Sequence, residues 1–332
     1  MTFVEVVRGG LVESRHAVHV AVADASGRLV SSIGDADRVT YYRSAAKPFQ
    51  TLPLIEDGVA DRLGLTEDEL ALCCGSHEGE DAHLAGARSI LAKAGIDEGA
   101  LRCGAHTPFS PSVAKALAAA GREPERIHNN CSGKHAGMLA LAAAHGWPLE
   151  GYHQEHHPVQ VRMREEVVRW AGVPDSAVAT GVDGCGVTCF AVPLVAMAAS
   201  FARFGAAAHA GAAPARVVRA MHERPFMVGG TGRCCTLVME RTGGAVFVKL
   251  GAEGVYGGGL PMRGLGFAIK VEDGGRRAVE AALIRVLEGL GVLSDKDVAA
   301  LGGFAEPPVR NTRDDVVGVV RATFDLPAPE PT

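Results

Sequence analysis

The order of strand-like and helix-like segments along the 332-residue chain constrains the fold more than any single motif does. Residues 16–23 alternate apolar and polar side chains, Asp24–Gly27 has turn composition, and residues 28–33 resume the strand pattern. Alternation on both sides of a short turn predicts a β-hairpin near the start of the chain.

Strand patterns return near the other end of the chain. Residues 245–251 and 264–271 are predicted to be strands, with Gly257–Gly259 near their connection. Residues 276–290 then show the apolar spacing of an amphipathic helix.

The middle of the chain is predicted to be mainly helical. Thr66 and Glu69 form the pattern of a capping box before an apolar run. Three further segments are predicted as helices from apolar spacing or alanine content: 112–121, 132–145 and 157–171.

These patterns predict an α/β (α+β) sandwich. Strands from both termini would form one antiparallel sheet that packs with helices, and a helical lobe would be inserted between them. We expect one catalytic domain over residues 1–332. Its predicted parts are a sheet part at 1–43 and 230–325, a helical part at 44–229, and a flexible tail at 326–332.

Composition narrows the class of partner and the compartment. Charged residues make up 21% of the chain and the net charge is -5, which gives no reason to expect nucleic acid or a membrane surface. The longest apolar stretch, 190–202, is broken by Pro193 and is too short for a membrane span. The start of the chain lacks the pattern of a signal peptide. We therefore expect a cytoplasmic protein whose eight cysteines stay reduced.

The first candidate for chemistry is Ser44 with Lys47. Residues three apart share one helical face, so the lysine amine could act as a base for the serine hydroxyl. Pro48 is tolerated in the first turn of a helix, which places Ser44 near a helix start. Lys249, on a predicted strand, could supply a second cation. An isolated S-x-x-K match is more often a capping serine and a surface lysine, and a lone lysine on a strand is ordinary.

A second candidate is Ser76, which lies in the segment Cys73–Glu80. Glycines on either side of its polar residues indicate a tight, exposed turn. Ser76 could be a nucleophile, a proton shuttle or a hydrogen-bond partner of the substrate, and the alternative is a solvated turn.

A third candidate is a metal site. Cys131 and Lys134 are spaced like the ligands of a C-x-x-C motif, and Cys185 lies among glycines that permit close backbone approach. Together they could hold Zn²⁺, although lysine binds a metal only as the neutral amine. The alternative is a pair of buried thiols and a turn.

Taken together, the motifs resemble the asparaginase II family, which is related to the serine β-lactamases. The resemblance rests on six segments in the order of the family: Arg43–Gln50, Cys73–Glu80, Cys103–Pro108, His128–Leu139, Gly181–Val187 and Lys249–Val255. It implies a serine β-lactamase-like fold, in agreement with the strand and helix order.

The resemblance also implies the roles of individual residues. The implied catalytic pairs are Ser44 with Lys47 and Ser76 with Lys249. The implied zinc ligands are Cys131, Lys134 and Cys185. The implied pocket residues are Asp183, His135, Arg43 and Cys235. Cys235 is the weakest transfer, because its local match is short.

The function predicted from these features is hydrolysis of L-asparagine to L-aspartate and ammonia. Ser44 is the favoured nucleophile, and the reverse assignment makes Ser76 the acylated residue. Three alternatives stay open: a β-lactamase-like glutaminase or other amidohydrolase, a metallohydrolase with zinc-activated water, and a non-catalytic zinc-binding protein. A homodimer is expected from the size of the chain.

Overall fold

The computed structural model describes residues 2–327. Its contacts divide the chain into two compact units. Unit 1 comprises Met1–Ala45, Ala191–Ala206 and Leu237–Thr332, and unit 2 comprises Ala46–Phe190 and Ala207–Thr236. The limits predicted for a sheet part and a helical part stay predictions.

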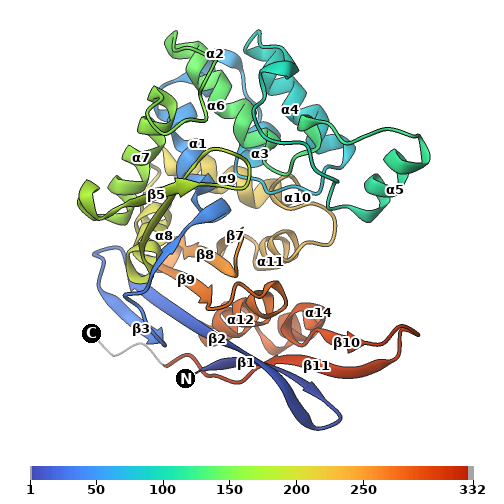
Figure 1. Ribbon diagram of the computed structural model, residues 1–332. Helices are drawn as coiled ribbons and strands as arrows, with labels where there is room; N and C mark the ends of the chain where they lie inside the picture. The colour runs from blue at the N-terminus through green and yellow to red at the C-terminus, as the bar shows by residue number, and fades with distance from the viewer. Residues whose placement is uncertain (1, 328–332) are drawn as a thin grey trace. The chain divides into compact units, whose positions relative to one another are not determined.

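Unit 1 is built on an antiparallel sheet, which is eight-stranded within residues 2–327. Seven strands follow one another in the spatial order β10 (Pro308–Arg310), β11 (Val316–Ala322), β1 (Phe3–Arg8), β2 (Leu11–Asp24), β9 (Leu265–Val271), β8 (Val255–Leu260) and β7 (Phe247–Gly251). The eighth, β3 (Leu29–Ile33), pairs with the second half of β2. Figure 1 shows blue N-terminal and red C-terminal strands side by side in this sheet. The predicted antiparallel sheet from both termini is therefore confirmed.

The predicted hairpin is confirmed by the pairing of β2 with β3. The connection predicted near Gly257–Gly259 is wrong, because these glycines lie inside strand β8, between β7 and β9. A Cβ atom at Gly257 would lie 2.2 Å from the ring of Phe201. The glycines thus allow a helix to approach the strand closely.

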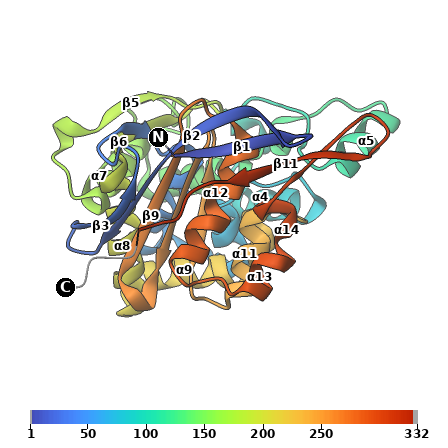
Figure 2. The same cartoon turned by 90° about the horizontal axis from the view of Figure 1, so that it is seen from below.

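Helices pack on this sheet. The helix that carries Phe201 is α8 (Leu194–His209), and a Cβ atom at Gly266 of β9 would lie 2.3 Å from its backbone. Helix α12 (Arg276–Gly289) contacts β1, β8, β9 and β11, which confirms the helix predicted at 276–290. Figure 2 shows α12 with its neighbours α13 (Asp295–Ala300) and α14 (Gly302–Ala305). The α/β fold class predicted from the sequence is confirmed.

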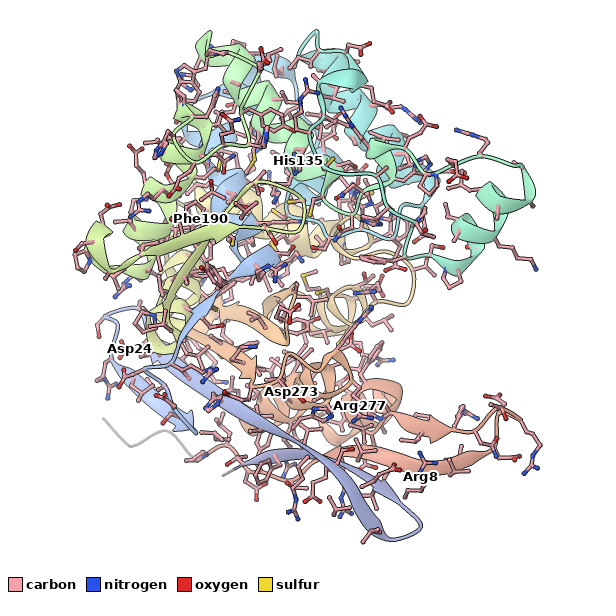
Figure 3. The ribbon with its side chains drawn as sticks, viewed as in Figure 1. Arg8, Asp24, His135, Phe190, Asp273 and Arg277 are labelled. Carbon is pink, nitrogen blue, oxygen red and sulfur yellow. The ribbon has the colours of Figure 1, made fainter. Side chains whose placement is uncertain are left out.

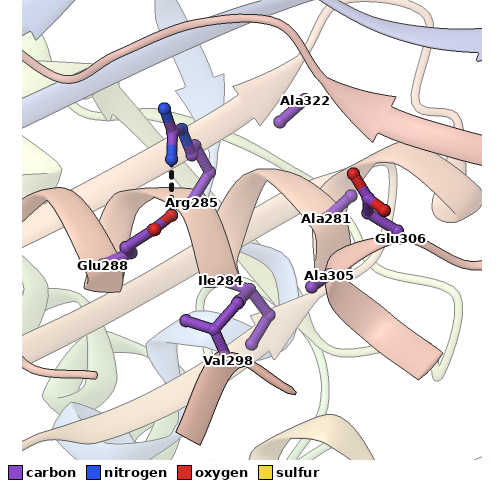
Figure 4. Close-up of a pocket in the computed structure, with 8 residues that line it drawn as sticks. All are labelled: Ala281, Ile284, Arg285, Glu288, Val298, Ala305, Glu306 and Ala322. Atoms are coloured by element: carbon purple, nitrogen blue, oxygen red, sulfur yellow. Dashed lines mark hydrogen bonds and ion pairs between the residues drawn. The ribbon is translucent and has the colours of Figure 1, made fainter. Parts of the chain in front are cut away.

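A small cavity lies among α12, α13, α14 and β11 (Figure 4). Its volume is 210 Å³, and Arg285 at its rim donates a hydrogen bond of 2.6 Å to Glu288. None of the residues predicted to act in catalysis or metal binding lines it.

Unit 1 also contains β4 (Val39–Tyr41), which pairs with Ala191–Pro193 of β6 (Thr188–Pro193). The chain continues from β4 into a short 3-10 helix at Arg43–Ala46. The start of the predicted tail is in contact with this unit, since Ser31 donates a hydrogen bond of 2.7 Å to the carbonyl of Pro327. Residues 328–332 of that tail lie outside the described residues.

Unit 2 is mainly helical. Its helices are α1 (Lys47–Glu56), α2 (Val59–Leu63), α3 (Glu67–Cys73), α4 (Asp81–Lys93), α5 (Pro111–Ala119), α6 (Ser132–His145), α7 (Pro158–Ala171), α9 (Pro214–Glu223) and α10 (Pro225–Val228). A short strand, β5 (Ala179–Val182), precedes the turn that carries Cys185, and α11 (Cys234–Thr242) begins in this unit. The helices predicted at 112–121, 132–145 and 157–171 are confirmed as α5, α6 and α7.

The capping box predicted at Thr66 is confirmed, since the Glu69 backbone N–H donates to the Thr66 hydroxyl and the Thr66 N–H donates to the Glu69 carboxylate. Within residues 2–327, no helix combines the length and the apolar character that crossing a membrane would require.

Small residues bring α6 close to α3. A Cβ atom at Gly133 would lie 2.5 Å from the side chain of Leu72, and one at Gly137 would lie 2.8 Å from the sulfur of Cys73. The glycines permit this approach because they carry no side chain. The close packing places the start of α6, which carries Lys134, beside the end of α3, which leads into Ser76.

Candidate active site

The segment of residues 74–80, here called the Ser76 segment, connects α3 to α4 in unit 2. A Cβ atom at Gly75 would lie 2.7 Å from the carbonyl oxygen of Met227, so only glycine fits there. The Ser76 N–H donates to the carbonyl of Val228 at 2.9 Å, and the His77 N–H donates to the carbonyl of Asn130 at 3.1 Å. Backbone hydrogen bonds on both sides therefore fix this segment.

The prediction of an exposed turn here is wrong. His77 is 1% exposed and Glu78 is 6% exposed. The polar residues are buried because each has a partner inside unit 2, including Arg233 for Glu78 at 2.8 Å. Buried polar groups persist where such partners satisfy them.

Lys47 is the most deeply buried cation of the candidate site. It is the first residue of α1, its exposed fraction is 0%, and its Nζ donates to Ser76 Oγ at 3.0 Å and also to the carbonyl of Gly75. Burial of an amine without such partners would be unfavourable. The structure thus brings Lys47 together with Ser76, whereas the predicted pairs of Ser44 with Lys47 and Ser76 with Lys249 stay predictions.

Ser44 and Arg43 lie in the 3-10 helix of unit 1. Arg43 has a φ of 50°, which is uncommon for a residue other than glycine, and such strain is often found at functional sites. The residue before it, Tyr42, is close to strand β7, because a Cβ atom at Gly251 would lie 2.6 Å from the Tyr42 carbonyl oxygen. The segment that carries Ser44 therefore begins beside β7.

Lys249 lies on the same strand, β7, in unit 1. It is 1% exposed, and its Nζ donates to the carbonyl of Leu250 at 2.9 Å. Ser44 and Lys249 thus belong to one unit, and Lys47 and Ser76 belong to the other. Cys235 is buried in the first turn of α11.

The three predicted metal ligands come together inside unit 2. Cys131 caps the start of α6, Lys134 lies in its first turn, and Cys185 lies in the turn after β5; all three are buried. Lys134 Nζ lies 3.2 Å from Cys185 Sγ, and the thiol of Cys131 hydrogen-bonds to Cys185.

The pKa values of the two thiols are shifted in opposite directions. The hydrogen bond from Cys131 and the nearby Lys134 hold the pKa of Cys185 well below its usual range, although burial opposes this. The pKa of Cys131 is raised to about 12, first by that same hydrogen bond and then by burial. Burial would lower the pKa of Lys134, but the charges of Cys185, Cys131 and Asp183 outweigh burial and raise it.

This donor set fits a metal that prefers sulfur and nitrogen, because two sulfur atoms and one amine converge in a buried place. Within residues 2–327 no group of three or more His, Cys, Asp or Glu side chains could hold a metal ion. The lysine amine would therefore have to serve as a ligand, and it would have to release the proton that its raised pKa retains, because only the neutral amine binds a metal.

Asp183 lies in the turn that presents Cys185. Its N–H donates to the carbonyl of Val187 at 2.8 Å, and its carboxylate accepts from the N–H of Gly184 at 2.8 Å. The turn therefore brings its negative charge close enough to act on Lys134.

His135 lies on α6, directly after Lys134 (Figure 3). Its Nδ1 is 2.6 Å from the hydroxyl of Tyr152, which accepts from the Arg102 N–H. The hydroxyl oxygen can accept a second hydrogen bond, so either Nδ1 or the hydroxyl supplies the proton of this contact. The Nε2 atom of His135 is buried and has no hydrogen-bond partner among the described residues. Burial lowers the pKa of His135 to about 3, so the ring is neutral at pH 7.

His77 and His83 are also held neutral. The Gly79 N–H donates to His77 Nδ1 at 3.1 Å, so His77 Nε2–H donates to Ser132 Oγ at 3.0 Å. Burial lowers the pKa of His77 far below its ordinary value of 6.5, and it lowers that of His83 as well.

A pH dependence of stability follows from these two rings and from His135, whose pKa is also lowered. Because their folded-state pKa values lie below the unfolded value of 6.5, the unfolded chain binds more protons once the pH falls through 6.5. We expect the free energy of unfolding in urea to decrease from pH 7.5 to pH 5. The decrease should be smaller in His77→Gln, whereas the same change at the exposed His156 should leave it unaltered. A stability that stays constant over this pH range would contradict the neutral state of His77.

Several residues of this site carry no motif signal that the sequence alone could interpret. Tyr152 and Arg233 are such residues: Tyr152 is buried against His135, and Arg233 is partly buried beside Glu78. Ser132, Glu78 and Glu80 lie within the segments His128–Leu139 and Cys73–Glu80, but nothing in those segments indicated their hydrogen-bond partners.

Known proteins provide an independent comparison. The family model described as L-asparaginase II matches residues 4–322. No curated protein matches the chain.

Among solved structures, the native form of Mglu has a TM-score of 0.36 and 18% identity, over 85% of this chain and 67% of that one. Mglu in its L-glutamate binding form in 4.3 M NaCl has a TM-score of 0.36 and 17% identity, over 85% and 61%. The chain thus spans about two thirds of the Mglu chains or slightly less.

The family model covers nearly the whole chain, including every predicted site residue. It confirms the resemblance that the six motifs indicated. The chain belongs to the L-asparaginase II family.

Proposed function

We propose that this protein hydrolyses L-asparagine to L-aspartate and ammonia by serine–lysine chemistry. Membership of the family makes the chain an amidohydrolase of the asparaginase type. The observation that carries the finer proposal is the buried Lys47, whose Nζ donates to Ser76 Oγ at 3.0 Å. A buried amine beside a hydroxyl is the arrangement that a lysine base requires.

In this proposal Ser44 attacks the side-chain amide, and Lys47, three residues later, accepts the serine proton. The backbone strain at Arg43 supports Ser44 as the nucleophile, because strained backbone commonly presents a reacting group. Ser76, hydrogen-bonded to Lys47, relays protons to the departing ammonia and from the hydrolytic water. Lys249 supplies the second cation.

The α-amino and α-carboxylate groups of asparagine need partners of opposite charge. We assign Arg43 to the carboxylate and Asp183 to the ammonium group. The Nε2 atom of His135, buried and without a partner among the described residues, is assigned to a hydrogen bond with the substrate. Cys235 completes the proposed pocket. A site built to hydrogen-bond each polar group would select a free amino acid over a peptide.

The proposal includes one Zn²⁺ per chain, held by Cys131, Lys134 and Cys185. Their convergence within unit 2 supports it. When bound, zinc would offer a polarising charge and an open coordination position for the substrate's α-groups. A homodimer in the cytoplasm completes the proposal and is supported only by chain size and composition.

Ammonia release from purified protein tests the function. We expect release from L-asparagine and much slower release from L-glutamine at equal concentration. Equal rates on both amides would favour a broader amidohydrolase, and no release from either would contradict the proposal. Activity that is lost with chelation but survives Ser44→Ala would instead favour a zinc-activated water.

The metal site gives a separate prediction. Elemental analysis should find zinc near one equivalent per chain, and Cys185→Ser should lose most of it, because a serine hydroxyl is a poor zinc ligand. Cys189→Ser, four residues away and also buried, is the matched control. Fully active protein without a transition metal would leave the two thiols with a structural role.

A further inference from the structure

Two carboxylates of the Ser76 segment bind another part of unit 2. Glu80 accepts from the N–H of Thr231 at 2.8 Å and from its hydroxyl at 2.7 Å. Glu78 pairs with Arg233 at 2.8 Å. Both partners belong to residues 229–233, here called the Gly229 loop, which ends directly before Cys234 and α11.

The fit between the two segments is close. A Cβ atom at Gly230 would lie 2.5 Å from Glu78 Cγ and 3.0 Å from Glu80 Oε1, and Gly230 also has a φ of 115°. Only glycine combines that backbone conformation with that space. The Thr236 hydroxyl donates to the carbonyl of Gly230 at 2.9 Å, which ties the loop to the first turn of α11.

The same region reaches the Ser76 backbone. The carbonyl of Val228, directly before the Gly229 loop, accepts the N–H of Ser76 at 2.9 Å. The side chain of Ser76 in turn accepts from Lys47 at 3.0 Å. A shift of the loop would therefore move Ser76 relative to Lys47.

The negative charge of the two carboxylates explains why they bind the Gly229 loop at fixed points. Glu78 is 6% exposed, and a buried carboxylate is costly unless a cation and hydrogen bonds satisfy it. Arg233 meets that need with the 2.8 Å ion pair, which ties the Gly229 loop to the Ser76 segment. Charge-assisted hydrogen bonds to Glu80 add a second fixed point.

We propose that Glu78 and Glu80 are positioning residues, which hold the Gly229 loop so that Ser76 stays within hydrogen-bond distance of Lys47. This inference rests on the proposed function, because it assigns Ser76 and Lys47 to the reaction. In this inference neither glutamate contacts the reacting atoms. Their effect on catalysis passes through the loop and Ser76.

The test uses Glu80, which is less buried than Glu78 and can be changed with less risk to folding. We expect Glu80→Ala to lower kcat about 10- to 100-fold, because small displacements of reacting groups have effects of that size. KM should stay within about threefold, since substrate-binding groups are untouched. Glu80→Gln should recover part of kcat, because its amide oxygen still accepts the Thr231 N–H.

A double-mutant cycle tests whether the effect of Glu80 on kcat passes through Thr231. If Glu80 acts through Thr231, then Glu80→Ala combined with Thr231→Val should be no slower than Glu80→Ala alone. The control is Glu98→Ala, which breaks a 2.7 Å ion pair with Arg88 at the surface of the same unit and should leave kcat unchanged.

Two outcomes would overturn the inference: a kcat of Glu80→Ala within twofold of the parent, or fully additive losses in the cycle. The Ser76→Ala variant tests the proposed function separately. Normal turnover in Ser76→Ala would remove Ser76 from the reaction. Impaired Ser76→Ala together with normal Glu80→Ala would refute the positioning role alone.

Discussion

Ser44→Ala should lower turnover of L-asparagine by about two to four orders of magnitude. That is the range expected when a nucleophile or its base is removed from a site whose binding groups remain. Alanine keeps the backbone and removes only the hydroxyl, so the fold should be retained. The measurement is kcat for ammonia release by purified, folded protein.

The matched control for Ser44→Ala is Ser176→Ala, an exposed position in unit 2, which should leave kcat unchanged. Ser76→Ala should be impaired as well, because it removes the proposed relay. Near-normal turnover in Ser44→Ala together with an inactive Ser76→Ala variant would make Ser76 the acylated residue. Near-normal turnover in both would end the serine–lysine account.

Lys47→Met should have an effect of similar size. Methionine has a similar length and suits a fully buried position, but it offers neither a base nor a donor to Ser76 Oγ. We expect kcat to fall about 10²- to 10⁴-fold without loss of folding. Circular dichroism and the midpoint of urea unfolding would confirm that the fold is retained.

Lys47→Arg separates two roles of this lysine. Arginine keeps the positive charge but cannot give up its proton in a protein. If Lys47 is a base, arginine should be as poor as methionine, whereas substantial recovery would mean that only the charge is needed. Lys115→Met, on the exposed face of α5, is the control and should be silent.

The sequence predicted those parts of the fold that local patterns encode. The hairpin of β2 and β3, helix α12 and the capping box at Thr66 each depend on neighbours within one short segment. Strand β8 was missed because its three consecutive glycines have low strand propensity. Glycine is needed in this strand because the ring of Phe201 packs against Gly257. The two residues lie 56 positions apart, so no local sequence pattern indicates their contact.

The same distinction applies to the candidate site. The motif around Ser76 identified the segment, but the glycines beside it suggested an exposed turn, whereas tertiary partners bury His77 and Glu78. Lys47 was paired with Ser44 because the two are three residues apart. Its hydrogen bond to Ser76 joins residues 29 positions apart, and only the packing of α1 with α3 and α6 brings them together.

The three predicted metal ligands could be proposed because their residue types and spacing are visible in the sequence. Cys131 and Lys134 share the first turn of α6, so their proximity is local. Cys185 is distant in the sequence, and only its residue type and the glycines around it grouped it with them. The structure places its sulfur 3.2 Å from Lys134 Nζ, a contact over 51 positions.

The central claim is covalent catalysis by a serine, and trapping the intermediate tests it most directly. The enzyme would be mixed with L-asparagine, quenched in acid within milliseconds, digested and analysed by mass spectrometry. The account predicts an aspartyl ester on the peptide that contains Ser44, absent from Ser44→Ala and from enzyme without substrate. An ester on the Ser76 peptide would reverse the two serines, and rapid turnover with no ester on any serine would contradict the account.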